Sequence, residues 1–290
     1  MRRVSRYASL LLMPLVPVFQ GRIEQVMGHL PSQAERLYLR TGGQVRRMFP
    51  GLEGLMASVY WLRTVQYYGH QRAFATEKRY DLLAPLIDIT TALDPRMELA
   101  YRYGAIFLSE AWPNGAGRPE EGVAILERGI RALPGSWRLR WDLGSLWFFF
   151  LKDHKKAADV LLGAATIPGA PFWLESLAAT ILGQGGHREI SREIWKRQYD
   201  NANGDHIRAN ALYHIQQLDA LDACDSLSAL AARFAQRNGR LPSSPEEVVA
   251  AGFASRIPLD PSGVPLSYDA AVGRFSIARA SKFWRSRYDQ

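Results

Sequence analysis

A helical pattern that ends in proline recurs along the sequence. Helix-forming stretches end at Pro95, Pro134 and Pro168, and the intervals between these prolines are 39 and 34 residues. A small residue follows each proline by nine or ten positions, and these small residues are Gly104, Gly144 and Ala178. A unit of about 34 residues that is built from two helices has an apolar face that it cannot bury alone. The repeat therefore restricts the chain to stacked pairs of helices.

Apolar residues follow the period of an α-helix from residue 51 to about residue 230. Leu55, Val59 and Leu62, for example, recur at three- and four-residue spacing, which places them on one face of a helix. Pairs such as Pro134–Gly135 mark the turns between helices. Because the alternation typical of strands does not occur in this stretch, we expect an all-α fold.

The recurring residues resemble the tetratricopeptide repeat (TPR) family, in which small residues let two helices pack closely and a proline ends the unit. The residues that carry this resemblance are Trp61, Val65, Leu83 and Pro95 in the first unit; Gly104, Phe107, Gly122, Leu126, Gly129 and Pro134 in the second; Leu143, Gly144, Trp147, Ala157, Ala164 and Pro168 in the third; and Leu177, Ala178, Ile181, Ile190 and Ile194 in the fourth. Val65 and Leu83 are large where the family has small residues, and the second unit carries about six extra residues between its helices.

The resemblance implies a right-handed TPR-like α-solenoid of about four helical hairpins plus extra helices, with a concave face that binds a protein or peptide. Carried over onto this sequence, the groove residues are Glu98, Tyr101, Arg138, Trp141, Ser145, Phe148, Phe172 and Glu175. Aromatic side chains beside an arginine are typical of interaction hot spots. Packing in the core is the alternative role for any single one of these aromatic residues, and both roles stay open for Arg138 with Trp141.

After about residue 205 the sequence pattern changes. Two further helices are expected between residues 205 and 237, and a region rich in proline and glycine follows them. Ser244 precedes Pro245 and predicts a short helix, and Asp260–Gly263 reads as a turn. Alternation in residues 266–268 and 274–277 predicts a β-hairpin. We therefore expect a small C-terminal α/β-hairpin cap.

This tail also resembles the globular part of the major pseudopilins of type II secretion, in which a long helix leads into such a unit. The matching residues are Asn238, Gly239, Arg240, Pro242, Ile257, Pro258, Asp260, Pro261, Gly263, Pro265 and Tyr268. The calcium-binding loop of those proteins is not clearly present, so no metal is carried over. Two interpretations stay open, namely a subdomain that closes the last helices of the solenoid and a part that acts in pilus-type assembly.

The positive charge lies at the ends of the chain. The net charge is +8, of which residues 1–50 contribute +6 and residues 269–290 contribute +3, so residues 51–268 are near neutral. A nucleic-acid-binding domain usually carries a basic stripe on its fold, and this body predicts none. Arg2, Arg3 and Arg6 precede an apolar run, which is the order of a signal anchor with its positive flank in the cytoplasm. A soluble protein with an apolar first helix is the alternative.

Catalytic signatures are absent from the sequence, which has no nucleophile elbow, zinc-protease motif, phosphate-binding loop or dinucleotide fingerprint. The single cysteine, Cys224, lies among leucines at helical spacing and predicts a buried structural thiol. His206 and His214 are eight residues apart without acidic residues at ligand spacing. We therefore expect no enzyme activity, no cofactor and no metal.

The predicted organisation is a signal anchor over 1–20, a basic connector over 21–50, a TPR-like solenoid over 51–200, additional helices over 201–236, a pseudopilin-like subdomain over 237–280 and a basic tail over 281–290. The expected function is a non-catalytic scaffold, anchored in a bacterial inner membrane with its soluble part in the periplasm. It would bind a protein or peptide partner and support a larger complex. A component of a secretion or pilus-type assembly system and a soluble cytoplasmic adaptor are the alternatives.

Overall fold

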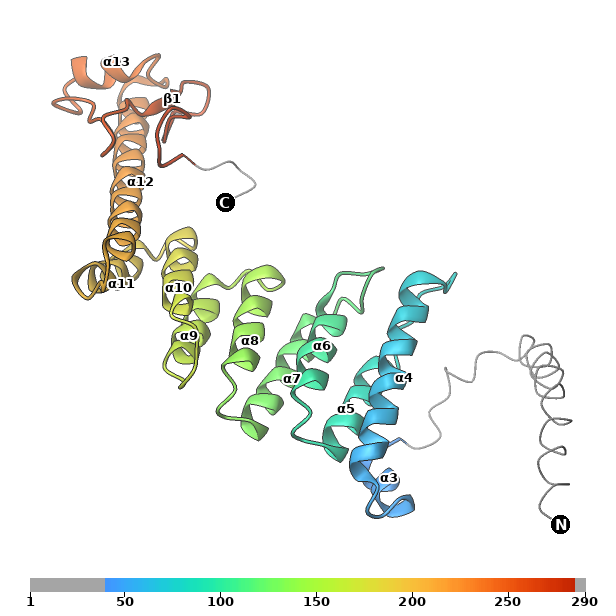
Figure 1. The fold of residues 1–290 in the computed structure, drawn as a ribbon. Helices are drawn as coiled ribbons and strands as arrows, with labels where there is room; N and C mark the ends of the chain where they lie inside the picture. Colours follow the sequence, from blue (N-terminus) through green and yellow to red (C-terminus); the bar gives the residue numbers. More distant parts are fainter. Residues whose placement is uncertain (1–39, 285–290) are drawn as a thin grey trace, which may run out of the picture. The chain divides into compact units, whose positions relative to one another are not determined.

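The structure is a computed structural model that describes residues 40–284 (Figure 1). The described chain divides into two compact units between Pro134 and Gly135, called unit 1 and unit 2. The described part is mostly helical, with one two-stranded sheet. This confirms the predicted helical class. The boundary at Pro134 falls inside the range that the sequence predicted as one solenoid.

In unit 1 the helices are α3 (Gly42–Met48), α4 (Glu53–Ala73), α5 (Leu83–Leu93), α6 (Glu98–Ser109) and α7 (Pro119–Ala132). From α4 to α7 each helix packs against the next, and α3 packs against α4 and α5. Local sequence sets these boundaries. Thr41 and Gln44 form a reciprocal capping box at α3, and Pro119 begins α7, where its missing N–H costs no hydrogen bond.

In unit 2 the helices are α8 (Trp137–Phe149), α9 (His154–Ala165), α10 (Trp173–Gln184), α11 (Arg188–Asp200), α12 (Asp205–Asn238) and α13 (Pro245–Ala250). Each helix from α8 to α12 packs against the next one. The core between α9 and α12 is built from small and branched side chains such as Ala157, Leu161, Leu182 and Ile194, with Trp195 buried among them.

The prediction of two helices between residues 205 and 237 is wrong, because α12 is one continuous helix of 34 residues. No glycine or proline lies between Asp205 and Asn238, so nothing in the sequence breaks it. Gly204 precedes the helix and Gly239 ends it with a φ of +73°, a left-handed conformation that glycine adopts without steric cost.

The predicted β-hairpin is present, as β1 (Ser267–Asp269) pairs antiparallel with β2 (Arg274–Ser276), with Tyr268 opposite Phe275. The predicted turn is present as well, since the carboxylate of Asp260 accepts hydrogen bonds from the backbone N–H groups of Ser262 and Val264. Leu266 and Phe275 of this region pack on Cys224, Leu227 and Ala231 of α12. The hairpin therefore shares a small core with the C-terminal half of α12.

Three residues that carry the pseudopilin resemblance, Arg240, Pro242 and Tyr268, form contacts at the end of α12. The guanidinium of Arg240 forms two hydrogen bonds with the carboxylate of Glu247, and that carboxylate also accepts from the backbone N–H of Ser243. The hydroxyl of Tyr268 donates to the carbonyl of Pro242 at 2.8 Å. These contacts join the loop after α12 to α13 and to the hairpin.

We expect the stability of this subdomain to depend on pH through Glu247. The hydrogen bond from Arg240, followed by that from Ser243, lowers the pKa of Glu247 from its ordinary 4.5 to about 2. A carboxyl whose pKa is depressed by folding stabilises the fold above its unfolded pKa and loses that contribution as the pH falls toward the folded pKa. The melting temperature of the full chain should therefore exceed that of Glu247→Gln at pH 6, with the difference closing between pH 4.5 and 2.

The matched control for this prediction is Glu193→Gln, at an exposed position on α11. Its difference from the wild-type chain should stay small and nearly constant over the same pH range. A difference for Glu247→Gln that does not depend on pH would contradict the proposed role of the Arg240 pair.

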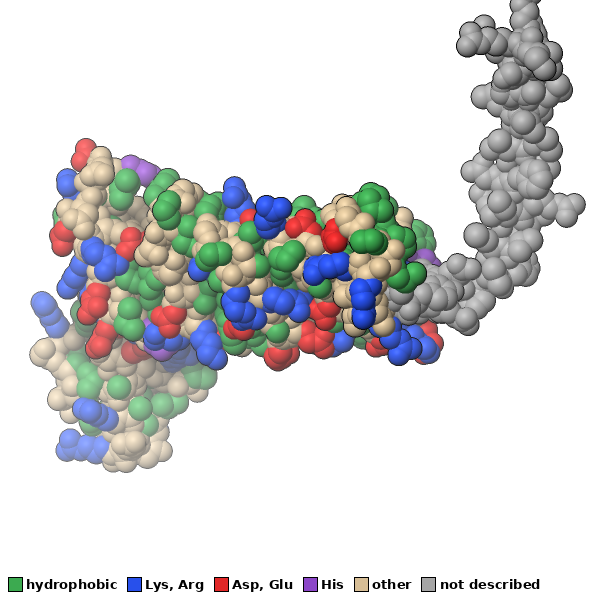
Figure 2. All heavy atoms as spheres, turned by 90° about the horizontal axis from the view of Figure 1, so that it is seen from below, with side chains coloured by type: hydrophobic (Ala, Val, Ile, Leu, Met, Phe, Trp, Pro, Cys, Tyr) green, Lys and Arg blue, Asp and Glu red, His purple; other side chains and the backbone are tan. Residues whose placement is uncertain are grey.

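No helix within residues 40–284 is long and apolar enough to cross a bilayer. The predicted anchor over 1–20, its flank of Arg2, Arg3 and Arg6, and most of the predicted connector lie outside the described residues. On the face of the molecule seen in Figure 2, lysine and arginine side chains lie among aspartate and glutamate side chains rather than in one broad basic field.

Candidate binding groove

Unit 2 contains a groove of about 1220 Å³ between helices α10 to α12 and the segment that runs from β1 to Trp284. Its apolar lining includes Trp195, Phe275 and Phe283, which are each at most 2% exposed. At the groove Val272 is 65% exposed and Trp284 is 39% exposed. The volume exceeds that of typical small-molecule pockets and can hold several side chains of a peptide.

Polar side chains of α12 hold the C-terminal wall of this groove. The side-chain amide of Gln217 donates to the carbonyl of Phe283 at 3.1 Å, and the hydroxyl of Tyr213 donates to the carbonyl of Lys282 at 3.1 Å. The hydroxyl of Ser281 donates to the carboxylate of Asp260. Burial alone would raise the pKa of Asp260, but hydrogen bonds from Ser281, Ser262 and the backbone hold it below its usual value. The wall is thus bound to two separate elements.

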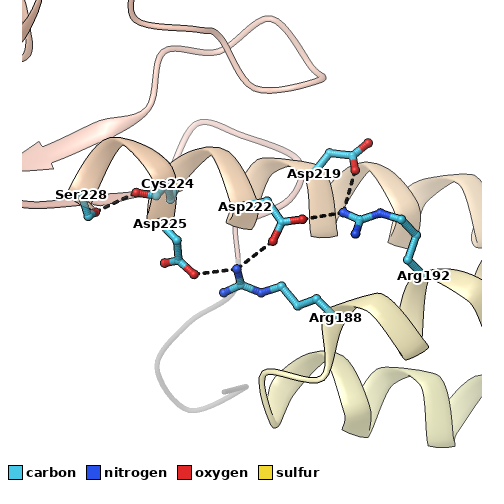
Figure 3. A network of polar contacts seen from close by, with 7 residues as sticks. All are labelled: Arg188, Arg192, Asp219, Asp222, Cys224, Asp225 and Ser228. Atoms are coloured by element: carbon cyan, nitrogen blue, oxygen red, sulfur yellow. Dashed lines mark hydrogen bonds and ion pairs between the residues drawn. The ribbon is translucent and has the colours of Figure 1, made fainter. Parts of the chain in front are cut away.

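The strand β2 is attached to α12 through Ser228. The backbone N–H of Phe275 donates to the Ser228 hydroxyl at 2.9 Å, and that hydroxyl donates to the carbonyl of Cys224 at 2.7 Å (Figure 3). Cys224 is buried, as the sequence predicted, and burial raises the pKa of its thiol to about 11. The thiol therefore stays protonated at neutral pH, which is unsuited to a nucleophile.

Two arginines of α11 and three aspartates of α12 form a connected network at the side of the groove (Figure 3). Arg188 contacts Asp222 at 2.9 Å and Asp225 at 2.6 Å, while Arg192 contacts Asp219 at 2.9 Å and Asp222 at 2.6 Å. The two arginine side chains are only 23% and 21% exposed. Because Asp222 bridges both of them, it is the central member of the network that joins α11 to α12.

Replacing Asp222 by alanine should lower the free energy of unfolding by about 1–2 kcal/mol, because both half-buried arginines lose a charged partner. Burial alone would raise the pKa of Asp222, yet the hydrogen bonds from Arg192 and Arg188 lower it, so the carboxylate is stabilised in its charged form. Urea unfolding measured by circular dichroism tests this. The control Asp219→Ala removes the partner of one arginine only, and an equal loss from both variants would contradict the bridging role.

Some of the charged side chains at the groove form ion pairs within the described part of the chain, and others do not. Arg274 and Arg279 line it, and neither forms an ion pair with another residue of the described part of the chain. The Arg279 guanidinium lies 5.9 Å from the centre of the Trp284 ring. Asp225, also at the groove, is already paired with Arg188. Asp269, which stands opposite Arg274 in the hairpin, lines the groove as well. The groove therefore presents the exposed Val272 and Trp284 with two arginines and one carboxylate beside them, and Arg279 is the cation farther along the chain from Asp269 that a carboxylate on a partner could pair with.

In unit 1 the two predicted groove residues, Tyr101 and Glu98, differ in how far they are buried. Tyr101 is 1% exposed, and a Cβ placed on Gly129 of α7 would lie 2.7 Å from the Tyr101 ring. Tyr101 is therefore a core residue, and its assignment to a binding surface is wrong. Glu98 is half-buried in the first turn of α6, where its charge suits the positive end of the helix.

Four of the predicted groove residues in unit 2 lie on α8, and most of them pack inward. The Arg138 guanidinium lies 4.6 Å from the ring centre of Trp137 rather than over Trp141. Trp141 packs against the core and meets Trp173 edge-to-face at 5.0 Å. Ser145 donates to the carbonyl of Trp141, and Phe148 packs on the same core. The alternative of core packing thus holds for Trp141 and Phe148.

Phe172 and Glu175 do share a cavity, of about 310 Å³, with residues of α11 and the start of α12. Phe172 is 83% exposed, and Glu175 is ion-paired with Arg197. This cavity is smaller than the groove at β2. Of the eight predicted partner-binding residues, none lines the larger groove.

The sequence did not predict the groove at α11, α12 and β2, because its lining comes from segments up to about 100 residues apart. The available signal was the absence of glycine and proline through residues 205–238, which predicts one long helix against which the tail packs. Within residues 40–284, no group of histidine, cysteine, aspartate or glutamate side chains is arranged to hold a metal ion.

Comparison with protein-family models, with curated proteins and with solved structures gives no match for this chain.

Proposed function

We propose that this protein is a non-catalytic scaffold of the tetratricopeptide type that binds a segment of a protein partner in the groove of unit 2. The observation that carries the proposal is the groove itself, where Val272 and Trp284 are exposed and Arg274 and Arg279 lie beside them. Aromatic anchors surrounded by charged residues are typical of interfaces that bind a peptide. A partner segment with apolar side chains and a carboxylate would suit it.

Helix packing within each unit favours the tetratricopeptide assignment. A Cβ placed on Gly144 of α8 would lie 2.8 Å from the Leu161 side chain of α9, so the two helices approach closely at a glycine. Alternate helices also meet, since Trp61 of α4 stacks on Phe107 of α6 at 6.2 Å. Such contacts between first helices of successive hairpins are expected of a right-handed solenoid.

The proposed location is a bacterial inner membrane, with the soluble part in the periplasm. It depends on the order of Arg2, Arg3 and Arg6 followed by an apolar run. Fractionation of cells with protease added to spheroplasts tests it. We expect the chain in the membrane fraction and accessible to protease, and recovery in the soluble cytosolic fraction would overturn the location.

Photo-crosslinking in cells tests the groove directly. A photo-reactive amino acid at Val272, which lines the groove, should give a discrete product with a partner protein. The same amino acid at Leu259, which is 57% exposed and lies outside the groove lining, is the matched control. Ser276→Trp, which fills the groove from an exposed position on β2, should remove the Val272 product. A product that is equal at both positions, or unchanged by Ser276→Trp, would contradict the proposal.

A second candidate function is a component of a secretion or pilus-type assembly system. The continuous 34-residue α12, which leads into the Asn238–Gly239–Arg240 segment, α13 and the hairpin, favours it. The element order follows the pattern of the pseudopilin resemblance. In this case the photo-reactive amino acid at Leu259 should give a ladder of products that contain several copies of this chain, whereas a subdomain that only closes the helices should give none.

A further inference from the structure

The second cavity of unit 2, of about 310 Å³, lies where the start of α10, the end of α11 and the start of α12 come together. Uncharged polar side chains make up much of its lining, namely Ser176, Gln198, Asn201, Asn203 and Asn210. Glu175 and Arg197 also line the cavity and form an ion pair with each other, so their charges cancel. A site of this size and composition favours a small uncharged ligand over an ion.

The amide groups at this cavity have hydrogen-bonding capacity to spare. Within residues 40–284 the exposed side chains of Asn201, Asn203 and Asn210 have no hydrogen-bond partner. The Ser176 hydroxyl donates to the amide oxygen of Gln198 at 2.9 Å, which leaves the NH₂ group of Gln198 for a ligand. Each amide side chain offers two N–H donors and one acceptor oxygen. The cavity therefore suits a ligand that both donates and accepts hydrogen bonds at several points.

An apolar surface borders these amides. Phe172 is 83% exposed, and its ring pairs with no other aromatic ring in the described part of the chain. Ile207 lines the same cavity from α12 and is 40% exposed. The negative face of an aromatic ring attracts groups with positive edges, such as C–H groups. A sugar ring has a face of C–H groups and a rim of hydroxyl groups that each donate and accept, so the cavity complements both parts of a sugar.

We propose that this cavity binds a neutral carbohydrate, with Phe172 against the face of one sugar ring and with Asn201 and Asn210 on its hydroxyl groups. The volume suits about one or two sugar rings. A peptide segment is less suited, because a bound peptide is held by apolar anchors in pockets and this lining is largely amide. No residue lines both this cavity and the groove at β2, so the inference does not depend on that groove.

Titration of the full chain with neutral trisaccharides tests the proposal. Maltotriose and the trimer of N-acetylglucosamine would be followed by saturation-transfer NMR in mild detergent. We expect saturable binding of at least one of them, with a dissociation constant of about 1 mM or below. Phe172→Ala should weaken it about threefold to tenfold, because the stacking face is removed. The matched control is Phe74→Ala in unit 1, where Phe74 is 80% exposed. Failure of both sugars to bind, or equal effects of the two variants, would overturn the proposal.

Replacing Asn210 by leucine tests the amide contacts. Leucine keeps the approximate size of the side chain but removes its donors and its acceptor, so the affinity for the sugar should fall about tenfold. Asn114→Leu, at an exposed position in unit 1, is the control and should leave the affinity unchanged. Equal affinity of Asn210→Leu and the wild-type chain would contradict the proposed contacts.

A photo-reactive amino acid at Ile207 distinguishes a sugar from a protein at this cavity. A discrete protein product at Ile207, together with no binding of either trisaccharide, would assign the cavity to a peptide and overturn the proposal. We expect no such product. The Val272 product reports on the groove separately, so either proposal can fail while the other holds.

Discussion

Replacing Trp195 by alanine is expected to lower the free energy of unfolding of unit 2 by about 3–5 kcal/mol. Trp195 is 1% exposed, so its removal leaves a cavity between α11 and α12. It also stacks on His214 of α12, with 4.1 Å between the ring centres and 11° between the ring planes. Because Trp195 lines the groove as well, the variant should lose the partner product at Val272 along with stability.

Urea unfolding followed by circular dichroism measures this loss. The matched control is Trp173→Ala, which removes a tryptophan of the same unit that is 39% exposed and should cost much less. If both substitutions lower the midpoint equally, the burial of Trp195 between α11 and α12 is not what stabilises this part of the chain.

Gly144→Val is expected to have the second largest effect, a loss of about 2–3 kcal/mol through overpacking between α8 and α9. A Cβ at this position would lie 2.8 Å from Cγ of Leu161 and 3.2 Å from the carbonyl oxygen of Ala157. The backbone oxygen cannot move without displacing the helix, so only part of the clash can relax. Valine at this position would also push α8 away from α9, and the proposed tetratricopeptide packing requires these two helices to lie close together.

Gly163→Val in α9 provides the control, because nothing lies within 4 Å of a Cβ placed at Gly163. Valine there should change the free energy of unfolding by less than about 0.5 kcal/mol, since the helix propensities of glycine and valine differ little. The melting temperatures of both variants, measured by thermal unfolding, test this prediction. A Gly144→Val protein as stable as Gly163→Val would argue against tight packing at this glycine.

Local chemistry explains why the C-terminal subdomain could be predicted so closely from the sequence. The turn at Asp260, the start of α13 at Pro245 and the pairing of β1 with β2 each depend on residues within about ten positions of one another. Such signals are contained in a short window of sequence. The helical class of residues 51–230 could be predicted for the same reason, as periodicity is also a local property.

Long-range packing explains what the sequence did not predict. Tyr101 has the spacing of a groove residue, and only the close approach of Gly129, 28 positions later, shows that it is buried. The network of Arg188, Arg192 and Asp222 joins side chains 30 or more residues apart, and no motif marks it. The candidate groove was missed because its lining side chains belong to five separate elements, α10, α11, α12, β1 and β2, and to the segment that follows β2.

The central claim, that the groove of unit 2 binds a segment of a partner, is tested most directly by the affinity of the segment that crosslinks at Val272. That segment, prepared as a peptide, would be titrated into the full-length chain, into Ser276→Trp and into the control Leu259→Trp. We expect saturable binding that Ser276→Trp weakens at least tenfold, about 1.4 kcal/mol, and that Leu259→Trp leaves unchanged. Equal affinity for all three chains would contradict the assignment of this groove as the binding site.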